Sequence, residues 1–329
     1  MRYTQRSFFP APLRVRNGPD VAAKASTDPS IELKEKPLLF NLTSVVVHYG
    51  PPQPTMRVAK CALAYSASVV VVANDRSPRP EELDSRVDWL VPPKNLGFGD
   101  GFTWGARHRP AEIFLVLNND IIIGDDTVQV CVQAFSDSTI GVVGPVLHYE
   151  DGSLQSGAGA LSPVICASRP RIDPGIGGSD CVWVTGAMMF VRASTLYSVG
   201  MDGSYFLGYE DADFCIRARE MGWRVRCVGS APATHFGSRV ISGPRWSYYA
   251  TRNYVWFARS RFSRTRAVAA WVWQVGLLPR VVLADLVKRR DITSSRLMVL
   301  GLRHSLRSKP SAAEGPWKGE PMPAAFMKW

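Results

Sequence analysis

The chain has 329 residues, 46% hydrophobic and 20% charged, which is enough for one large domain with additions or for two small ones. Its formal net charge of +11 is uneven, because residues 241–310 hold 14 basic and 2 acidic residues, whereas residues 41–240 hold 16 and 20. This uneven charge excludes a uniformly basic nucleic-acid-binding domain. The six cysteines are scattered and form no Cys-x-x-Cys pair, which excludes a thiolate zinc site and favours a reducing compartment.

The composition also divides the chain along its length. Residues 1–40 contain five prolines and lack the continuous apolar run of a secretory signal, so we expect a partly flexible extension. Residues 41–240 have the pattern of a folded domain. Residues 241–310 are basic and rich in aromatic residues, and we expect helices there, followed by a flexible tail at 311–329.

Four apolar or β-branched runs predict buried strands in the first half of the folded domain. They are residues 44–49, 68–73, 87–91 and 113–117. A probable helix at about 54–66 separates the first two. Strands that alternate with helix-length segments predict an α/β fold with a mostly parallel central sheet flanked by helices.

Polar residues lie at the carboxyl ends of three of these strands: His48-Tyr49, Asn74-Asp75 and Asn118-Asn119-Asp120. Ligands bind beyond the carboxyl ends of strands in such sheets, so we expect these residues to border a site. Asp120 could hold Mg²⁺ or Mn²⁺, which prefer oxygen ligands and substrate phosphates. Asn and Asp are also ordinary turn residues.

The glycine-rich stretch at 95–102 fits neither common nucleotide motif. It lacks the third glycine of the dinucleotide fingerprint, and no Gly-Lys-Ser/Thr ends it as in a phosphate P-loop. A nicotinamide oxidoreductase therefore loses support, and a loop that enters a helix is the simplest interpretation.

In the second half of this domain we expect strands at 140–147 and 223–228, with a turn at 150–153 and a loop at 166–180. The run at 182–192 predicts a strand broken at Gly186-Ala187, where a ligand or another backbone could approach closely. We expect His235 to lie in a loop, as a structural histidine or a metal ligand.

Three carboxylates fall within four residues at Glu210, Asp211 and Asp213. They open a predicted helix, where carboxylates suit the positive end of the dipole. Carboxylates this close raise one another's pKa unless a cation or solvent compensates them. The cluster is either a solvated helix face or part of a site, and Asp213 is better placed to pair with Arg217 at i+4.

Taken together, these segments resemble the inverting nucleotide-sugar glycosyltransferases of family 2, which have the GT-A fold, and among them the bacterial rhamnosyltransferase-like enzymes of cell-surface polysaccharide synthesis. The motifs that carry the resemblance lie in the same order. They include Val-Val-His-Tyr, Ala-Asn-Asp-Arg-Ser, Asn-Leu-Gly-Phe-Gly-x-Gly, Leu-Asn-Asn-Asp, Asp-Gly-x-x-Gln, Trp-Val-x-Gly-Ala, Val-Gly-x-Asp-x-x-Tyr-Phe, Glu-Asp-x-Asp-x-x-x-Arg and Thr-His. They cover about 41–240, the implied catalytic domain, and Arg252-Asn253 and Gly301-Leu302-Arg303 resemble later landmarks of the family.

The resemblance implies a role for each matched position. Asp211 would be the general base that deprotonates an acceptor hydroxyl, with Glu210 as its neighbour and alternative. Asp120 and His235 would hold the divalent metal, Mg²⁺ or Mn²⁺, that bridges the donor diphosphate. The residues implied in nucleotide-sugar binding are His48, Tyr49, Asn74, Asp75, Asn95, Gly97, Phe98 and Asn119. Those implied on the acceptor side are Trp183, Gly186 and Ala187.

The implied reaction is metal-assisted, inverting single displacement. A hexose would pass from dTDP-rhamnose or a UDP-hexose to a glycan or polyprenyl-linked glycan acceptor. The chain departs from the family at Asn74-Asp75, where Asp-Asn is usual, at Asn118, where the metal motif often has an acid, and at Thr103, where Asn is commoner.

Within the segment 245–290, residues 245–266 alternate cationic and aromatic residues, and an apolar stretch at 267–287 that includes Arg280 and Asp285 follows them. These charges argue against a spanning helix. Tryptophans and flanking basic residues suit a helix that lies in the surface of an anionic membrane, and the alternative is a helix pair packed on the core. We therefore expect a cytoplasmic protein, peripheral on the inner face of the plasma membrane.

Two other function classes stay open. A nucleotidyltransferase also places acids after a parallel sheet, but Gly50-Pro51-Pro52 offers no basic phosphate loop. A non-catalytic sugar-nucleotide-binding or scaffold protein would fit the altered Asn74-Asp75 and the reduced metal motif.

Overall fold

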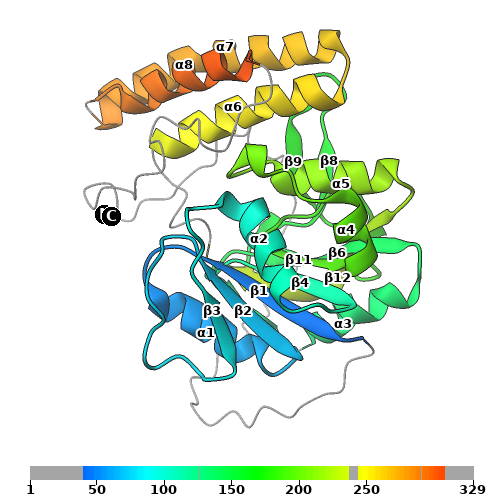
Figure 1. The fold of residues 1–329 in the computed structure, drawn as a ribbon. Helices are drawn as coiled ribbons and strands as arrows, with labels where there is room; N and C mark the ends of the chain where they lie inside the picture. Colours follow the sequence, from blue (N-terminus) through cyan, green and yellow to red (C-terminus); the bar gives the residue numbers. More distant parts are fainter. Residues whose placement is uncertain (1–39, 125, 237–243, 290, 308–329) are drawn as a thin grey trace. The chain divides into compact units, whose positions relative to one another are not determined.

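The computed structural model describes residues 40–124, 126–236, 244–289 and 291–307. Most of the expected extension at 1–40 and all of the tail at 311–329 lie outside these residues. Over the described ranges the protein is a mixed α/β structure, with helices on both faces of a central sheet (Figure 1).

The central sheet has ten strands. Its main path, in spatial order, is β10 (Ser179–Asp180), β12 (Arg224–His235), β6 (Ile140–His148), β11 (Met188–Arg192), β4 (Ile113–Leu117), β1 (Leu42–His48), β2 (Ser68–Ala73) and β3 (Val87–Leu90). Off this path, β5 (Ile121–Ile122) pairs with β12 and β7 (Leu154–Ser156) pairs with β6. A separate antiparallel pair consists of β8 (Ala158–Leu161) and β9 (Ser168–Ile172).

Strand direction decides which residues meet at the edge of this sheet. β1 is parallel to β2 and β4, and β12 is parallel to β6. β11 runs antiparallel to both of its neighbours, β4 and β6. The carboxyl ends of β1, β2, β4 and β12 therefore lie at one edge, together with the start of β11.

Alternate residues of the strands enter two cores, one on each face of the sheet. Val46 and Val71 pack with α1 (Pro52–Ala62) and α3 (Thr127–Gln133). Val45 and Val70 pack with α2 (Gly97–His108), α4 (Ala193–Val199) and α5 (Glu210–Glu220). The remaining short turns are the 3₁₀ segments η1 (Ala134–Ser136) and η2 (Gly203–Tyr205).

The basic C-terminal segment forms three helices that pack side by side (Figure 1). They are α6 (Pro244–Arg261), α7 (Arg264–Ala284) and α8 (Thr293–Ser305), with a π-helical turn, η3 (Asp285–Arg289), after α7. Tyr254, Ala270 and Leu302 form their shared apolar contact. Helix α7 continues through Pro279, which is exposed, so the carbonyl that lacks an amide partner one turn earlier can be solvated.

Two expected loops are partly strands. The 166–180 segment contains β9 and β10, whose polar sequences have no apolar alternation and are ordered by pairing with β8 and β12. The expected strand at 223–228 is longer than predicted: β12 continues to His235, with a register shift between Val228 and Ala233. The residues after Val228 are small or polar, so the apolar pattern did not predict this continuation.

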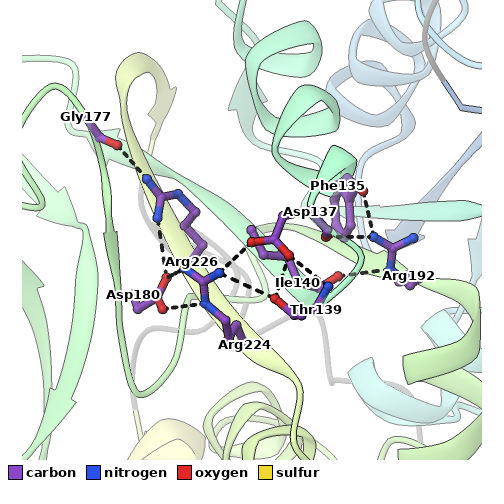
Figure 2. A network of polar contacts seen from close by, with 9 residues as sticks. All are labelled: Phe135, Asp137, Thr139, Ile140, Gly177, Asp180, Arg192, Arg224 and Arg226. Carbon is purple, nitrogen blue, oxygen red and sulfur yellow. Dashed lines mark hydrogen bonds and ion pairs between the residues drawn. The ribbon is translucent and has the colours of Figure 1, made fainter.

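A polar network fixes the opposite edge of the sheet, where β12 and β6 begin and β11 ends (Figure 2). Arg224 pairs with Asp137 and Asp180. Arg192 donates to the carbonyls of Phe135, Asp137 and Ile140. This edge is remote from the polar strand ends, so the network supports the sheet rather than a site.

Asp213 of α5 is fully buried and anchors the C-terminal helices. Its carboxylate accepts from Arg217 at 2.7 Å, which confirms the predicted i+4 pair, from Arg261 of α6 at 2.6 Å, and from the hydroxyl of Tyr205 at 3.1 Å.

Replacing Asp213 by Asn should lower the free energy of unfolding by about 3 kcal/mol, because it leaves two guanidinium groups without their buried anion. Urea unfolding followed by circular dichroism measures this loss. Arg86→Ala, which removes an exposed partner of Asp84, is the control and should leave the midpoint unchanged. An equal midpoint for Asp213→Asn and wild type would contradict the anchoring role.

Candidate active site

Asp120 and His235 meet at the polar edge of the sheet. Asp120 follows β4, and His235 ends β12, which lies three places away from β4 in the sheet order. Asp120 Oδ1 lies 3.0 Å from His235 Nε2, and the amide nitrogen of Asn118 lies 3.3 Å from the same ring nitrogen. The structure thus brings together the two residues that the resemblance implied as metal ligands.

The other ring nitrogen of His235 faces Gln155. His235 Nδ1 lies 2.6 Å from Gln155 Oε1, which can only accept, so Nδ1 carries a hydrogen. In the neutral ring the Nε2 lone pair then points at the Asp120 carboxylate. The side-chain NH₂ group of Asn118 also lies near this lone pair. A lone pair and a carboxylate that face each other can bind one cation between them, so these two groups fit a divalent metal.

This protein donor set is small. Among the described residues no group of three or more His, Cys, Asp or Glu side chains converges on one point. A cation held by Asp120 and His235 would therefore take its remaining ligands from amides, water or substrate phosphates.

Asp211 lies at the start of α5 and contacts the residues just before β11. Its Oδ2 accepts from the amide of Gly186 at 2.9 Å. The next residue, Ala187, accepts at its carbonyl from the amide of Asn118 at 2.9 Å. Gly186-Ala187 therefore joins Asp211 to the segment that carries Asp120, and the ring of Phe98 lies against Gly186 so closely that a Cβ there would come within 2.8 Å of it.

Glu210 is more deeply buried than its neighbour. Its side chain is 5% exposed, and its Oε2 has no hydrogen-bond partner among the described residues. Burial, and then the adjacent Asp211 carboxylate, raise the pKa of Glu210 to about 8. Burial also raises the pKa of Asp211, against amide hydrogen bonds from Gly186 and Ala212. The pair thus retains a proton near neutral pH, and half-buried Asp211 is the better placed to act on a substrate.

His48 lies behind the polar edge. It is fully buried, with Nδ1 2.7 Å from the hydroxyl of Thr55 and Nε2 3.5 Å from Asp75. Asn119 donates to the same Thr55 at 3.2 Å. Asp75 is half-buried and accepts from the amides of Gly50 and Ser77. Burial would raise the pKa of Asp75, but the hydrogen bonds from Ser77 and Gly50 outweigh it and lower that pKa.

The side chain of Asn74 is hydrogen-bonded to the backbone of a neighbouring loop. Its amide donates to the carbonyl of Gly97 at 2.7 Å and accepts from the amide of Leu96 at 3.2 Å, while Asn95 accepts from the amide of Gly97. The end of β2 thereby holds the loop that opens α2. Tyr49, Asn95 and Phe98 are half-buried, whereas Asn74 and Gly97 are buried.

Trp183 lies apart from this centre. It is nearly buried, and its indole nitrogen donates to the carbonyl of Ala160 in β8. Its ring therefore packs on the β8–β9 pair.

Sequence reasoning assigned no role to Thr55 or Gln155. Gln155 stands in the Asp-Gly-x-x-Gln motif, so that signal was present in the sequence. Thr55 is an ordinary helix residue, and only the fold reveals its contacts with His48 and Asn119.

Neither a protein-family model nor a curated protein sequence matches the chain. Among solved structures, the fold is similar to GalNAc-T7, crystallised with UDP, GalNAc and Mn²⁺, with a TM-score of 0.56 and 14% identity. The match covers 83% of this chain but 55% of that one. The fold is GT-A.

Two further structures have TM-scores below 0.5, too low to establish a shared fold. They are the mannosyltransferase PcManGT from Pyrobaculum calidifontis with GDP-Man and Mn²⁺ (TM-score 0.48, 14% identity, 81% of this chain and 87% of that one) and S. aureus TarS 1–349 (0.49, 12%, 82% and 81%). At 14% identity, the similarity to GalNAc-T7 establishes the GT-A fold and leaves the reaction to be argued from the site.

Glu210 should make stability depend on pH. Its pKa is about 8 in the folded protein against an ordinary value of 4.5, so the folded state binds more protons between these values and loses stability as pH rises through them. Relative to wild type, Glu210→Gln should therefore become more stable on going from about pH 5 to about pH 8. Urea unfolding at both pH values measures the change, and exposed Glu82→Gln is the control. A difference that does not vary with pH would contradict the burial argument.

Proposed function

We propose that the protein is a glycosyltransferase that moves a hexose from a nucleotide-diphospho-sugar to a hydroxyl of a glycan or lipid-linked glycan, with inversion and with help from a divalent cation. The observation that carries the proposal is the pairing of two polar centres on the GT-A fold. Asp120 with His235 forms one, Asp211 with Glu210 forms the other, and Gly186-Ala187 joins them.

In the proposed reaction Asp211 takes the proton of the acceptor hydroxyl, whose oxygen attacks the anomeric carbon in line with the departing diphosphate. Its raised pKa suits a base that works near neutral pH. The Gly186 amide orients its Oδ2, and Glu210, protonated near neutral pH, limits the negative charge around it. Single displacement of this kind inverts the anomeric centre.

On the donor side, Asp120 and His235 would hold Mg²⁺ or Mn²⁺. When bound, the cation supplies positive charge to the diphosphate leaving group. Asp75, Tyr49 and the Asn95–Phe98 loop would border the nucleoside, with His48, Asn74 and Asn119 holding these residues in place from behind. GalNAc-T7 was crystallised with UDP and Mn²⁺, which supports this choice of ligands. A dTDP- or UDP-sugar is the proposed donor, and a rhamnosyltransferase-like enzyme of family 2 is the proposed type.

The alternative functions predict different behaviour. A scaffold protein would bind a nucleotide sugar without consuming it, whereas a transferase usually releases some sugar to water in the absence of acceptor. A nucleotidyltransferase would need phosphate contacts after β1, and the Gly50 amide there is already bonded to Asp75.

We also propose that α7 binds the surface of an anionic membrane, the cytoplasmic face of a bacterial plasma membrane. One helical stretch in the described residues, Arg264–Val287, is long and apolar enough to cross a membrane by length and composition, and 11% of its most apolar window is buried. Its exposed apolar residues recur at helical spacing: Val268, Val272, Val275, Leu283 and Leu286. Exposed Arg264, Arg266 and Arg280 supply charge complementary to anionic lipid.

The catalytic proposal is tested by separating donor binding from transfer. Candidate nucleotide sugars are first screened by thermal shift with Mn²⁺, because a selective ligand stabilises the folded state. With the selected donor, Asp211→Asn should reduce transfer by roughly 10²-fold or more and leave the donor Kd unchanged. Asp120→Ala should weaken Mn²⁺-dependent donor binding by roughly 10-fold or more in calorimetry. Wild-type turnover by Asp211→Asn would remove Asp211 as the base, and a donor bound but never consumed by the wild type would favour the scaffold.

Membrane binding is tested by co-sedimentation with vesicles. The protein should bind vesicles that contain phosphatidylglycerol and not vesicles of phosphatidylcholine alone, and salt should weaken binding. The double variant Val272→Glu, Leu283→Glu should reduce the bound fraction roughly tenfold, since charge on the apolar face opposes insertion. Val91→Glu, on an exposed apolar residue outside α7, is the control. Resistance to alkaline extraction would indicate a spanning helix instead.

A further inference from the structure

The loop that leads into α5, residues 204–209 (the acid loop), has a strained backbone. Phe206 has φ 63° and Tyr209 has φ 76°, in a region that bulky aromatic residues rarely adopt. Such conformations persist only where the surroundings hold them. Tyr209 directly precedes Glu210, so the backbone path of this loop sets the positions of Glu210 and Asp211.

Two neighbouring side chains of α6 hold the acid loop. Arg252 is fully buried and donates from Nη2 to the carbonyls of Ser204 at 3.1 Å and Tyr205 at 2.7 Å. Asn253 is also fully buried, and its amide nitrogen lies 2.9 Å, 2.9 Å and 2.8 Å from the carbonyls of Tyr205, Leu207 and Gly208.

The orientation of the Asn253 amide is itself fixed. Arg252 Nε donates to Asn253 Oδ1 at 2.8 Å. This leaves the Asn253 NH₂ group facing the loop, where carbonyls are the only groups it meets in these contacts. The two residues therefore act as one unit that supplies donors to the loop.

The same face of α6 continues this contact. Tyr249 stacks on Phe206 at 5.3 Å, Phe257 packs on Tyr209 at 5.3 Å, and Arg261 binds Asp213. Tyr249, Asn253, Phe257 and Arg261 are four residues apart, so they lie along one face of the helix.

The other side of the acid loop contacts the proposed donor side. The amide of Phe98 donates to the carbonyl of Phe206 at 2.8 Å. Gly97 has φ 73°, and a Cβ there would lie 2.4 Å from the same carbonyl oxygen, so only glycine permits this approach. The acid loop thus lies between α6 and the Asn95–Phe98 loop.

We propose that Arg252 and Asn253 are positioning residues that fix the acid loop, and through it set the place of the Asp211 carboxylate relative to bound donor. The inference rests on the proposed function. Neither side chain is accessible to a substrate, so both act through the loop backbone rather than on reacting atoms.

The test uses Asn253→Asp, which has the same size but replaces the donating NH₂ by an oxygen that repels the three carbonyls. We expect kcat for transfer to fall roughly 10²-fold, since small misplacement of a catalytic group has effects of this order, while the donor Kd with Mn²⁺ stays within about threefold. Arg192→Gln is the matched control. Arg192 also holds three backbone carbonyls, at the remote edge of the sheet, and its loss should lower stability but leave kcat unchanged.

Two further readouts separate positioning from stability. A loosened loop admits water to Glu210 and Asp211, so the acidic limb of the pH–rate profile should shift to lower pH in Asn253→Asp only. Hydrogen exchange should quicken at the amides of 204–212 in Asn253→Asp and near 135–140 in Arg192→Gln.

An Asn253→Asp protein that melts earlier but keeps wild-type kcat, pH profile and exchange at 204–212 would overturn the inference. If this variant does not fold, Tyr249→Leu removes the ring stacked on Phe206 and must show the same selective loss of kcat; unchanged kcat would again overturn it. If the wild type consumes no nucleotide sugar, the proposed function fails, and the exchange data alone decide whether α6 holds the loop.

Discussion

β11 is antiparallel to its neighbours β4 and β6. Its first residues therefore lie beside the carboxyl ends of these two strands. Gly186-Ala187, just before β11, can therefore bond to Asn118 beyond β4 and to Asp211 at the start of α5. Had the strand run parallel, its first residues would lie at the edge occupied by Arg192. The relation between the two polar centres is thus a property of the sheet, in which β4 and the first four residues of β11 are buried and resist displacement.

The three acids of α5 lie in different surroundings. Asp213 is fully buried, and two arginines and a tyrosine surround its carboxylate. Glu210 is nearly as deeply buried, but its Oε2 has no hydrogen-bond partner among the described residues, and burial together with the adjacent Asp211 carboxylate raises its pKa. Asp211 lies between these extremes, half-buried, with amide donors and an open side. Three carboxylates of nearly the same sequence context have thereby acquired three distinct environments, which differ in what packs against the first turn of the helix.

Much of the sheet follows from the sequence, because β1, β2, β4 and β6 are continuous apolar runs bounded by turns, and burial on both faces leaves them no other structure. The segments that escaped prediction, β9, β10 and the end of β12, are polar or glycine-rich and owe their order to pairing partners. The resemblance named Asp120, His235 and Asp211, and the fold brings the first two together. The proposed metal, nucleotide and base roles stay predictions. No local pattern could show that His48 and Asn74 bond to the protein itself, or that Asn253 reaches Tyr205, since these contacts join residues of different elements that only the fold brings together.

The contact between α6 and the acid loop has a consequence for the order in which the molecule is completed. Asn253 follows Tyr205 by 48 residues, and every strand of the sheet precedes α6 in the chain. A chain that folds from its amino end during synthesis can pair its strands before α6 has left the ribosome, whereas Trp256 and Phe257 of α6 complete one of the two cores only afterwards. In that order the strained residues Phe206 and Tyr209 would have no α6 side chains to hold them until then, so the carboxylates of α5 would take their final places last.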